Sequence, residues 1–557
     1  YSIKGPKMKY LLTGVAALAL LTACGDKNKD ENGAGQAVTE QSQGKLPGVK
    51  LRKGDAASAS DVLSAFSLTQ SGSGRVSFES SDVKGAKAVF KDVTLLASED
   101  DSVEGMSLDD DDGELHLKGA DLKAATMEFE GLGMIDGKPN FSRVVLSDVS
   151  FVPKNPEESQ GTSEIKSMEL VNPSPETAAW IASLFGKGEA MDMPEGKALA
   201  FDLWSMKDMN FQIDEQDGQK GAFLISSISV LGLKDEKMAQ MALKGLTFDM
   251  TDPMDDTDVK ARLGNVDIRG VNFGMFAEMS EDSGNGSAAG LFEMLQNDPA
   301  NPGYDSIEIN DLNIDVSGAA FDMPKLNSRV SRDKKGRAVK VVTDPFKMTL
   351  GTVEGELGEK LGSQLALLGY EKLELSGQGE QSYDPDKDMV TIAEGKNFWK
   401  LEDGFRVDFS GKYEGASAFA AAQATPVADD GPADPGAQMQ EALQKMLIHN
   451  FRMSFDDNGF VDRAFNAYAA QSGQDPQQLR SQTAGMMAMA PMMAAGAGID
   501  PELAGEAATA LSSFLTDPKT LTITLAPAKP LRVAEFVEME DPSALTKTAL
   551  GFTAKNE

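Results

Sequence analysis

The stretch Phe90-Lys91-Asp92-Val93-Thr94-Leu95 contains the pattern that decides the fold of this chain. Apolar and polar residues alternate on both sides of Asp92, but the alternation slips by one position at the aspartate. Successive side chains of a strand point to opposite faces, so an unbroken strand would expose half of its apolar residues. A one-residue bulge returns them to one face, and Asp or Gly tolerates the backbone that a bulge needs. The stretch therefore predicts a bulged strand with one apolar face.

This slipped alternation returns along the chain with either Asp or Gly at the slip. It occurs in Leu115–Leu122, Met127–Met134, Val144–Phe151, Trp204–Phe211, Met241–Phe248, Val266–Phe273 and Ile307–Ile314. The copies are unevenly spaced, which argues against a solenoid of fixed period. Two short strands meeting at a tight bend are the alternative to a bulge. Hairpin signals separate alternating runs at Asp136-Gly137, Asp217-Gly218, Lys335-Gly336 and Asp403-Gly404.

Helix signals are sparse before residue 416 and frequent after it. Ser174-Pro175-Glu176 predicts a helix start, and Gly186 predicts its end. Further helices are expected at Ala288–Leu295, Leu357–Leu368, around Met439–Leu447, at Asp462–Gln471, and after Asp475-Pro476 and Asp500-Pro501-Glu502. A strand returns at Leu521–Leu525 and is expected to pair with Phe451–Phe455 or to close the preceding sheet. The fold class predicted is mainly β (α+β), with twisted antiparallel sheets of bulged repeated strands and a mostly helical C-terminal region.

A second informative stretch, Leu21-Thr22-Ala23-Cys24, predicts where the protein is held. It follows a basic start with Lys4, Lys7 and Lys9 and an apolar run that is too short for a membrane span. The stretch resembles the lipobox of bacterial lipoproteins, whose cysteine is acylated and becomes the mature N-terminus. Cys24 is the single cysteine of the chain, and a structural thiol is the alternative interpretation. We expect lipidation at Cys24 and no disulfides.

The lipoprotein resemblance also implies a location and a division of the chain. We expect a signal peptide at 1–23, the lipidated cysteine with a flexible polar tether at 24–60, and a β-rich body at 61–415. A linker or long loop at 416–437 and a mostly helical region with a returning strand at 438–557 complete the division. In lipoproteins of enteric type, Asp directly after the cysteine favours the inner membrane. Gly25 stands there in this chain, which favours the periplasmic side of the outer membrane.

The charge balance excludes several classes of partner. The formal net charge is −34, and removal of residues 1–23, which hold three lysines and no acid, would leave −37. Binding to nucleic acid or to anionic lipid requires clustered Lys and Arg, so neither is expected. The acyl chains at Cys24 are then the expected membrane contact. The many acids indicate a solvated surface, with divalent-cation binding by acidic loops as the alternative.

No motif identifies an active site. His116 alternates with leucines in a predicted strand, and His449 is expected at a helix end, so both are interpreted as structural. Zinc, phosphate-loop, dinucleotide and serine-hydrolase motifs are missing from the sequence; Gly186-Lys187 and Gly395-Lys396 lack the rest of a phosphate loop. The acidic runs Asp109–Asp112 and Asp252–Asp258 are interpreted as hairpin tips rather than calcium sites. We therefore predict no catalytic residue, no metal and no cofactor.

The run Met486–Met493 holds five methionines around Pro491. Thioether clusters can bind Cu(I), but packing or contact with an apolar ligand is the favoured interpretation.

An apolar sheet face must be covered or used. A dry core is the favoured interpretation, and a groove for a hydrophobic ligand is the alternative. The groove interpretation loosely resembles the AsmA-like and lipopolysaccharide-transport families of the bacterial envelope, whose curled sheets shelter acyl chains. The resemblance rests on the repeated bulged strands between residues 88 and 314. The leading hypothesis is a non-catalytic, lipid-anchored envelope protein that binds a hydrophobic ligand or an envelope partner. A purely structural or interaction lipoprotein with a dry core comes second, and an acid-dependent hydrolase third.

Overall fold

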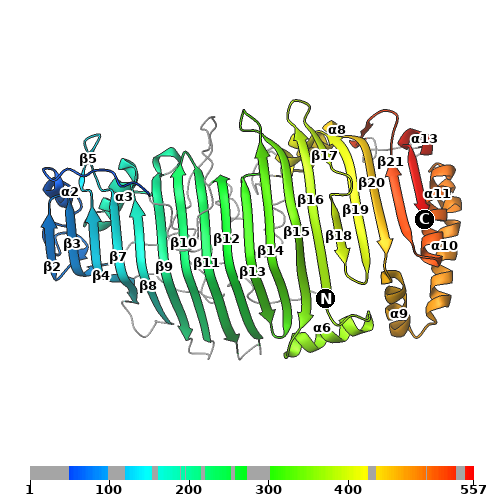
Figure 1. The fold of residues 1–557 in the computed structure, drawn as a ribbon, viewed down its shortest axis with the longest axis horizontal. Helices are drawn as coiled ribbons and strands as arrows, with labels where there is room; N and C mark the ends of the chain where they lie inside the picture. Colours follow the sequence, from blue (N-terminus) through cyan, green and yellow to red (C-terminus); the bar gives the residue numbers. More distant parts are fainter. Residues whose placement is uncertain are drawn as a thin grey trace. The chain divides into compact units, whose positions relative to one another are not determined.

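The computed structural model describes eleven segments of the chain, which form two compact units (Figure 1). The described residues are 49–97, 120–153, 161–188, 190–194, 196–214, 220–252, 257–272, 302–423, 435–496, 499–534 and 546–557. Unit 1 comprises residues 1–292 and 303–312, and unit 2 comprises 293–302 and 313–557. The predicted signal peptide, Cys24 and the predicted tether up to residue 48 lie outside the described residues.

Unit 1 is built on an antiparallel sheet in which neighbours along the chain are neighbours in space. Strands β3, β4, β7, β8, β9, β10, β11 and β12 pair in that order, and β1 and β2 both pair with β3. Their bounds are β1 (Val76–Ser77), β2 (Ser80–Lys84), β3 (Lys87–Leu95), β4 (Ala120–Glu130), β7 (Arg143–Pro153), β8 (Gly161–Val171), β9 (Phe201–Asp214), β10 (Lys220–Lys234), β11 (Lys237–Asp252) and β12 (Thr257–Asn272). A small hairpin, β5 (Gly133–Ile135) with β6 (Lys138–Asn140), turns at the predicted Asp136-Gly137. The predicted antiparallel, mainly β class is confirmed.

The predicted slip positions are where the backbone turns left-handed. Positive φ angles occur at Asp92 (51°), Asp148 (51°), Asp208 (49°), Gly245 (62°), Gly270 (66°) and Asp311 (55°). The strands continue through these residues, and the buried or half-buried apolar side chains on either side are three positions apart instead of two. In β9, for example, Met206 and Met209 are both 1% exposed while Asp208 lies in solvent. The slip therefore keeps one apolar face, as the sequence pattern predicts.

Pairing across the slip differs from that of an isolated one-residue bulge. In β10, Ile225 pairs with both Met209 and Leu246, and Ser227 pairs with both Lys207 and Lys244. The register is therefore the same on both sides of the slip, and neither strand gains a residue. On each strand one residue has no partner in the cross-strand register, and these unpaired residues lie opposite one another on neighbouring strands. The slips therefore line up across the sheet. We call this line the step row; it comprises Asp92, Ala125, Asp148, Lys166, Asp208, Ser226, Gly245 and Gly264 on successive strands from β3 to β12.

One end of the unit 1 sheet is closed by two helices and an aromatic cluster. Helix α3 (Pro175–Phe185) begins at the predicted cap Ser174, whose side chain accepts from the Thr177 N–H at 3.0 Å, and ends at Gly186. Helix α2 (Ala59–Ala65), which the start and stop signals do not predict, leads to Phe66. The ring of Phe66 lies 5.8 Å from Phe129, 5.9 Å from Phe141 and 6.2 Å from Phe185 between centroids. Such tilted and edge-on contacts stabilise a core beyond the burial of apolar area.

Unit 2 continues the antiparallel construction with shorter strands towards its C-terminal part. The order of pairing is β14, β15, β16, then β17 and β18 side by side, then β19, β20, β21 and β23; β22 also pairs with β20. The bounds are β14 (Ala319–Arg332), β15 (Ala338–Thr352), β16 (Leu373–Asp384), β17 (Met389–Ile392), β18 (Phe398–Leu401), β19 (Phe405–Glu414), β20 (Leu447–Asp457), β21 (Thr520–Leu525), β22 (Leu531–Arg532) and β23 (Phe552–Asn556). Strand β13 (Ser306–Val316) holds the boundary between the units. The predicted pairing of Leu521–Leu525 with Phe451–Phe455 is confirmed.

The helices of unit 2 agree with most of the start and stop signals. They are α6 (Glu356–Leu367), α7 (Ala416–Gln423), α8 (Pro435–Lys445), α9 (Phe460–Ser472), α10 (Pro476–Gly496), α11 (Pro501–Thr516) and α13 (Lys547–Leu550). Ala288–Leu295 lies outside the described residues. No helix in the described part of the chain combines the length and apolar character needed to cross a membrane.

The segment expected to be a linker, 416–437, contains helix α7 and the start of α8, with 424–434 outside the described residues. Alanine fills most of 416–422, and alanine has the highest helix propensity, which the emphasis on Pro and Gly overlooked. The division between compact units falls near residue 312, inside the segment expected to be one β-rich body. His449, expected at a helix end, lies in β20 because α8 already ends at Lys445.

Gly245→Ala tests whether the step row needs its left-handed residues. A Cβ at Gly245 would lie 2.3 Å from the Ser226 Oγ, on a backbone with φ of +62° that alanine disfavours. We expect a loss of about 2–3 kcal/mol in the free energy of unfolding, measured by urea denaturation of the full chain. Gly485→Ala in α10, where a Cβ meets open space, is the control and should stabilise by about 0.5–1 kcal/mol. Equal midpoints for Gly245→Ala and wild type would contradict the step row.

Candidate functional site: the cleft between helix α11 and strand β23

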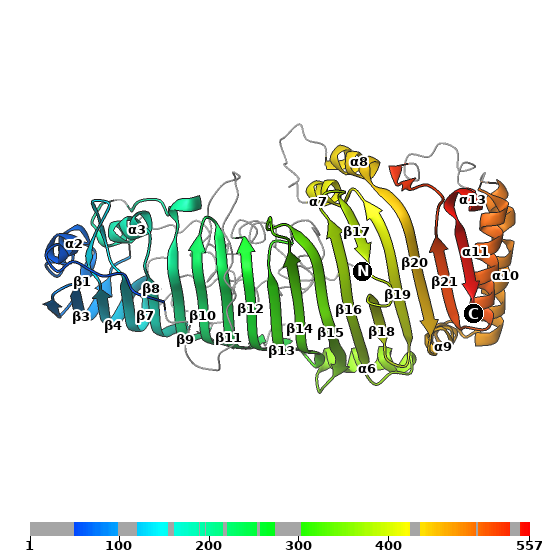
Figure 2. The same ribbon diagram turned by 45° about the horizontal axis from the view of Figure 1, so that its top comes forward.

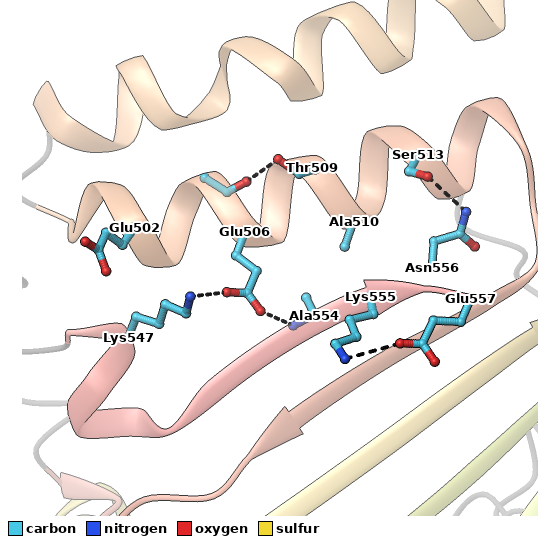
Figure 3. A pocket seen from close by; sticks show the side chains of 11 residues that line it. Glu502, Glu506, Thr509, Ala510, Ser513, Lys547, Ala554, Lys555, Asn556 and Glu557 are labelled. Carbon is cyan, nitrogen blue, oxygen red and sulfur yellow. Dashed lines mark hydrogen bonds and ion pairs between the residues drawn. The ribbon is translucent and has the colours of Figure 1, made fainter.

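A cleft of about 610 Å³ lies between helix α11 and strand β23 in unit 2 (Figure 3). Helix α11 begins at Asp500, whose carboxylate accepts from the Glu502 N–H at 2.9 Å and from the Lys547 N–H at 2.6 Å. This double cap fixes the start of α11 against the segment that leads into β23. The cleft is lined by Glu502, Gly505, Glu506, Thr509, Ala510, Ser513, Lys547, Ala554, Lys555, Asn556 and Glu557.

Glu506 is the central charged group of the cleft. Its carboxylate accepts from the Lys547 Nζ at 2.5 Å and from the Ala554 backbone N–H at 2.9 Å. The Lys547 ammonium lowers the pKa of Glu506, and Glu506 in turn raises the pKa of Lys547. Because β23 pairs with β21 on its other side, Glu506 satisfies an N–H that the sheet leaves without a strand partner. Glu506 therefore joins the helix to the edge of the sheet.

The other polar groups of the cleft are also engaged with one another. The Asn556 amide donates to the Ser513 Oγ at 3.1 Å and to the Asp517 carbonyl at 2.9 Å. The Thr509 hydroxyl donates to the Gly505 carbonyl at 2.7 Å, as is common within helices. No histidine lies among the lining residues, so none is placed there to accept the Ser513 proton. The cleft is built to hold α11 on β23 and to offer a shallow polar surface.

Unit 1 contains a pair of carboxyl groups, Glu79 and Asp92, in which one pKa is raised instead of lowered. Among the described residues, Glu79 is the carboxyl whose pKa is raised, because it shares a hydrogen bond with the Asp92 carboxyl. Both side chains are exposed to solvent near the β2 edge of the sheet. An acid catalyst needs such a raised pKa, but it also needs a pocket that excludes water and orients a substrate. Exposure makes this pair a weak candidate for the acid-dependent hydrolase hypothesis.

The residues singled out in the sequence do not converge on one site. His449 Nε2 lies 2.8 Å from the Glu414 Oε1 on the neighbouring strand, and His116 lies outside the described residues. Asp109–Asp112 and residues 253–256 also lie outside them, while Asp258 follows the β11–β12 turn. Within the described segments, no group of three or more His, Cys, Asp or Glu side chains is placed to hold a metal ion.

Methionines of the run Met486–Met493 form an exposed face on α10. Met486, Met489 and Met492 recur every three residues and are 56%, 55% and 78% exposed, whereas Met487 is half-buried. Helix α10 packs on α11 through its other face, where the Ser512 hydroxyl donates to the Ala484 carbonyl at 3.1 Å. These three methionines therefore do not pack in the described part of the chain, and contact with an apolar ligand, the other half of the favoured interpretation, stays a prediction. Methionine spacing alone does not distinguish the inner face of a helix from the outer face.

Unit 2 also has an apolar sheet face that is only partly covered. Three clusters cover parts of this face: one around Phe514 and Leu521 under α9 and α11, one around Leu365 and Leu401 under α6, and one around Tyr383 and Val390. Figure 2 shows α7 and α8 at one end of these strands and α6 and α9 at the other end. Between the clusters lie Phe409, Phe451, Met453 and Leu525, which are half-buried and share one face through their cross-strand pairing. We call these four residues the open patch.

Sequence reasoning missed both the cleft and the open patch. The Asp500-Pro501 start signal predicts α11, but no local signal pairs Glu506 with Lys547, 41 positions later in the sequence. The alternation of β19 and β20 predicts an apolar face, yet it cannot tell which part the helices leave uncovered.

Comparison with known proteins adds one match. Residues 398–557 match a protein-family model whose description is "Uncharacterized protein". No curated protein matches the chain. The matched segment begins at the first residue of β18 and contains the cleft, the methionine face of α10 and the open patch.

Glu506→Gln tests the electrostatic role of the cleft. Because the folded pKa of Glu506 is lowered from its ordinary value near 4.5, its stabilisation is present above that pH and is lost as pH falls through the lowered pKa. We expect Glu506→Gln to lower the free energy of unfolding at pH 7 by about 0.5–1 kcal/mol. The gap to wild type should close as the pH falls below about 4.5 in urea titrations at each pH.

Glu502→Gln is the matched control, since Glu502 lines the same cleft but acts on Lys547 only through a Coulombic interaction weaker than that of Glu506. A constant gap between Glu506→Gln and wild type at every pH would show that the Lys547 ion pair contributes nothing.

Proposed function

We propose that this chain is a non-catalytic, lipid-anchored protein of the bacterial cell envelope that acts by binding an apolar ligand. The anchoring part rests on Leu21-Thr22-Ala23-Cys24 and on the basic and apolar segments before it. Acyl chains at Cys24 are the membrane contact in this proposal, because the strongly acidic body would be repelled by anionic lipid. Gly25 favours the outer membrane over the inner membrane, as the lipoprotein resemblance implies, with the body in the periplasm.

The open patch is the observation that carries the binding part. Phe409, Phe451 and Met453 lie on one sheet face and stay half-buried, although three apolar clusters surround them on the same unit. Soluble proteins seldom leave neighbouring large apolar side chains partly in water without a use for them. Methionine adapts its shape to an apolar partner more readily than branched side chains do.

The second candidate is an interaction lipoprotein with a filled core, and unit 1 favours it. Met209, Ile225 and Leu246 lie on one face of the unit 1 sheet and are buried. On the same face the rings of Phe211, Phe223 and Phe248 contact one another in a row. These buried side chains are typical of a filled core in the described part of unit 1.

The non-catalytic part rests on the chemistry of the cleft. Its carboxylate with the shifted pKa, Glu506, is held ionised by Lys547 and cannot act as a general acid near neutral pH. Its hydroxyls donate to or accept from neighbouring groups of α11 and β23. These contacts stabilise the fold and leave no activated nucleophile among the lining residues.

Cys24→Ala tests the anchor. We expect the variant to be exported and to appear in the soluble periplasmic fraction, whereas wild type and the tether control Ser42→Ala stay with the membrane fraction. Incorporation of labelled palmitate should disappear in Cys24→Ala alone. A Cys24→Ala protein that still sediments with membranes would contradict the proposal.

Phe451→Glu tests the open patch in the Cys24→Ala background, which can be purified without detergent. We expect organic extraction and mass spectrometry to find an apolar ligand bound to the parent chain and missing from Phe451→Glu. Arg452→Gln is the control, because Arg452 lies next to Phe451 on the opposite face of β20 and pairs with Glu394 at 3.2 Å. Urea unfolding verifies that both variants fold.

A folded parent chain that carries no ligand would exclude the apolar-ligand hypothesis. The interaction lipoprotein with a filled core would then be the better explanation.

A further inference from the structure

Residues 50–55 are fastened to three distant loops of unit 1. The Arg52 N–H donates to the Asn172 Oδ1 at 3.1 Å, and the Asn172 amide donates back to the Lys50 carbonyl at 3.0 Å. The Ser142 hydroxyl donates to the Arg52 carbonyl at 2.6 Å, and the Asp55 N–H donates to the Leu132 carbonyl at 2.8 Å. These partners lie far downstream in the sequence, so the segment is held by the tertiary fold rather than by local structure.

The Arg52 side chain occupies a cage of oxygen atoms. Its Nη2 donates to the Pro173 carbonyl at 2.7 Å and to the Phe141 carbonyl and Asn140 Oδ1, both at 3.1 Å. Asn140 is 1% exposed, and its own Nδ2 and Oδ1 are oriented by the Pro173 carbonyl and the Phe141 N–H. All three bonds are made by Nη2 at the outer end of the guanidinium, whereas the Arg52 Nε is buried without a hydrogen-bond partner. The acceptors are therefore placed for the tip of the arginine side chain.

Close backbone packing shows that the segment and its site are fitted to each other. A Cβ at Gly54 would lie 2.6 Å from the Gly131 backbone, so both chains approach as only glycine allows. Gly131 has φ of +66°, and a Cβ there would overlap the Ser142 hydroxyl that binds Arg52. Asn172 completes the site from a left-handed conformation, with its amide also donating to the Asp202 carboxylate at 2.5 Å.

We propose that Asn140, Phe141 and Pro173 form a guanidinium-binding site whose ligand is Arg52 of the same chain. Residues 50–55 are a latch that joins the lipid tether to unit 1. Release of the latch frees the backbone around Lys50, Arg52 and Lys53 to enter the active site of a trypsin-like protease, and cleavage there separates the body from its anchor. The tethering consequence rests on the proposed lipid anchor at Cys24, whereas the occupied site itself does not.

Limited trypsin digestion of the full chain tests the latch, with cleavage after Lys50 measured by mass spectrometry. This bond is present in wild type and in every variant used. In Arg52→Ala the bond should be cut about tenfold faster or more, because cleavage requires local opening and the variant loses the hydrogen bonds that oppose it. Lys53→Ala, which alters an exposed neighbouring cation, should leave the rate after Lys50 at the wild-type value.

Chemical rescue separates a guanidinium site from a general loss of stability. Ethylguanidinium, which replaces the atoms that Arg52→Ala removes, should restore protection of the Lys50–Leu51 bond in this variant at millimolar concentration. Ethylammonium should not, because its nitrogen would lie at the position of Nε, which has no hydrogen-bond partner. The proposal is overturned if wild type is cut after Lys50 as fast as Arg52→Ala, or if ethylguanidinium restores nothing.

Digestion in the Cys24→Ala background distinguishes the latch from the anchor. Arg52-dependent protection in this background, together with a wild type that does not sediment with membranes, would leave the latch intact and exclude the anchor. If trypsin releases wild type and Arg52→Ala from membranes at the same rate, the anchor would be supported and the latch excluded.

Discussion

The rest of the structure depends on one constraint: an antiparallel strand must keep its apolar side chains on one face although the sequence alternation slips. A left-handed residue solves this at Asp92, Asp148, Asp208 and Gly245, and the same solution in every second strand keeps the slips in line. Asp tolerates this conformation better than most residues, and Gly adopts it without strain. The register survives because the neighbouring strand skips one residue at the same level. A single unmatched slip would transfer half of the apolar residues of one strand to the polar face.

This one-sided sheet has different consequences in the two units. In unit 1 the apolar face is buried, and side chains such as Ile225 and Met209 fill it. In unit 2 helices α6, α9 and α11 cover parts of the face and leave Phe409, Phe451 and Met453 half-buried. The family-model match at residues 398–557 falls on this second arrangement. Polar contacts such as Glu506 with Lys547 attach helices at the sheet edge.

Local signals in the sequence predict much of the fold. Ser174, Asp475 and Asp500 give helix starts, and the slip residues give the left-handed positions, because each effect depends on a residue and its nearest neighbours. The preserved register could not be predicted from the sequence. Ala125, Lys166 and Ser226 lie opposite the slip residues of the neighbouring strands, and none of the three is an Asp or Gly that would mark a slip. Non-local contacts were missed for the same reason. Arg52 meets Pro173 after 121 positions, and the exposed side of α10 depends on where α11 packs.

Disulfide cross-linking tests the matched slips most directly, and the chain suits it because Cys24 is its single cysteine. In a Cys24→Ala background, Ser227→Cys combined with Lys244→Cys places two thiols beyond the step row on paired positions of β10 and β11. We predict that this pair forms a disulfide under mild oxidation and that Ser227→Cys with Leu243→Cys does not, because Leu243 points to the opposite face. The reverse result, in which only the double variant with Leu243→Cys becomes cross-linked, would show that the register shifts by one residue at the slip and would contradict the matched slips.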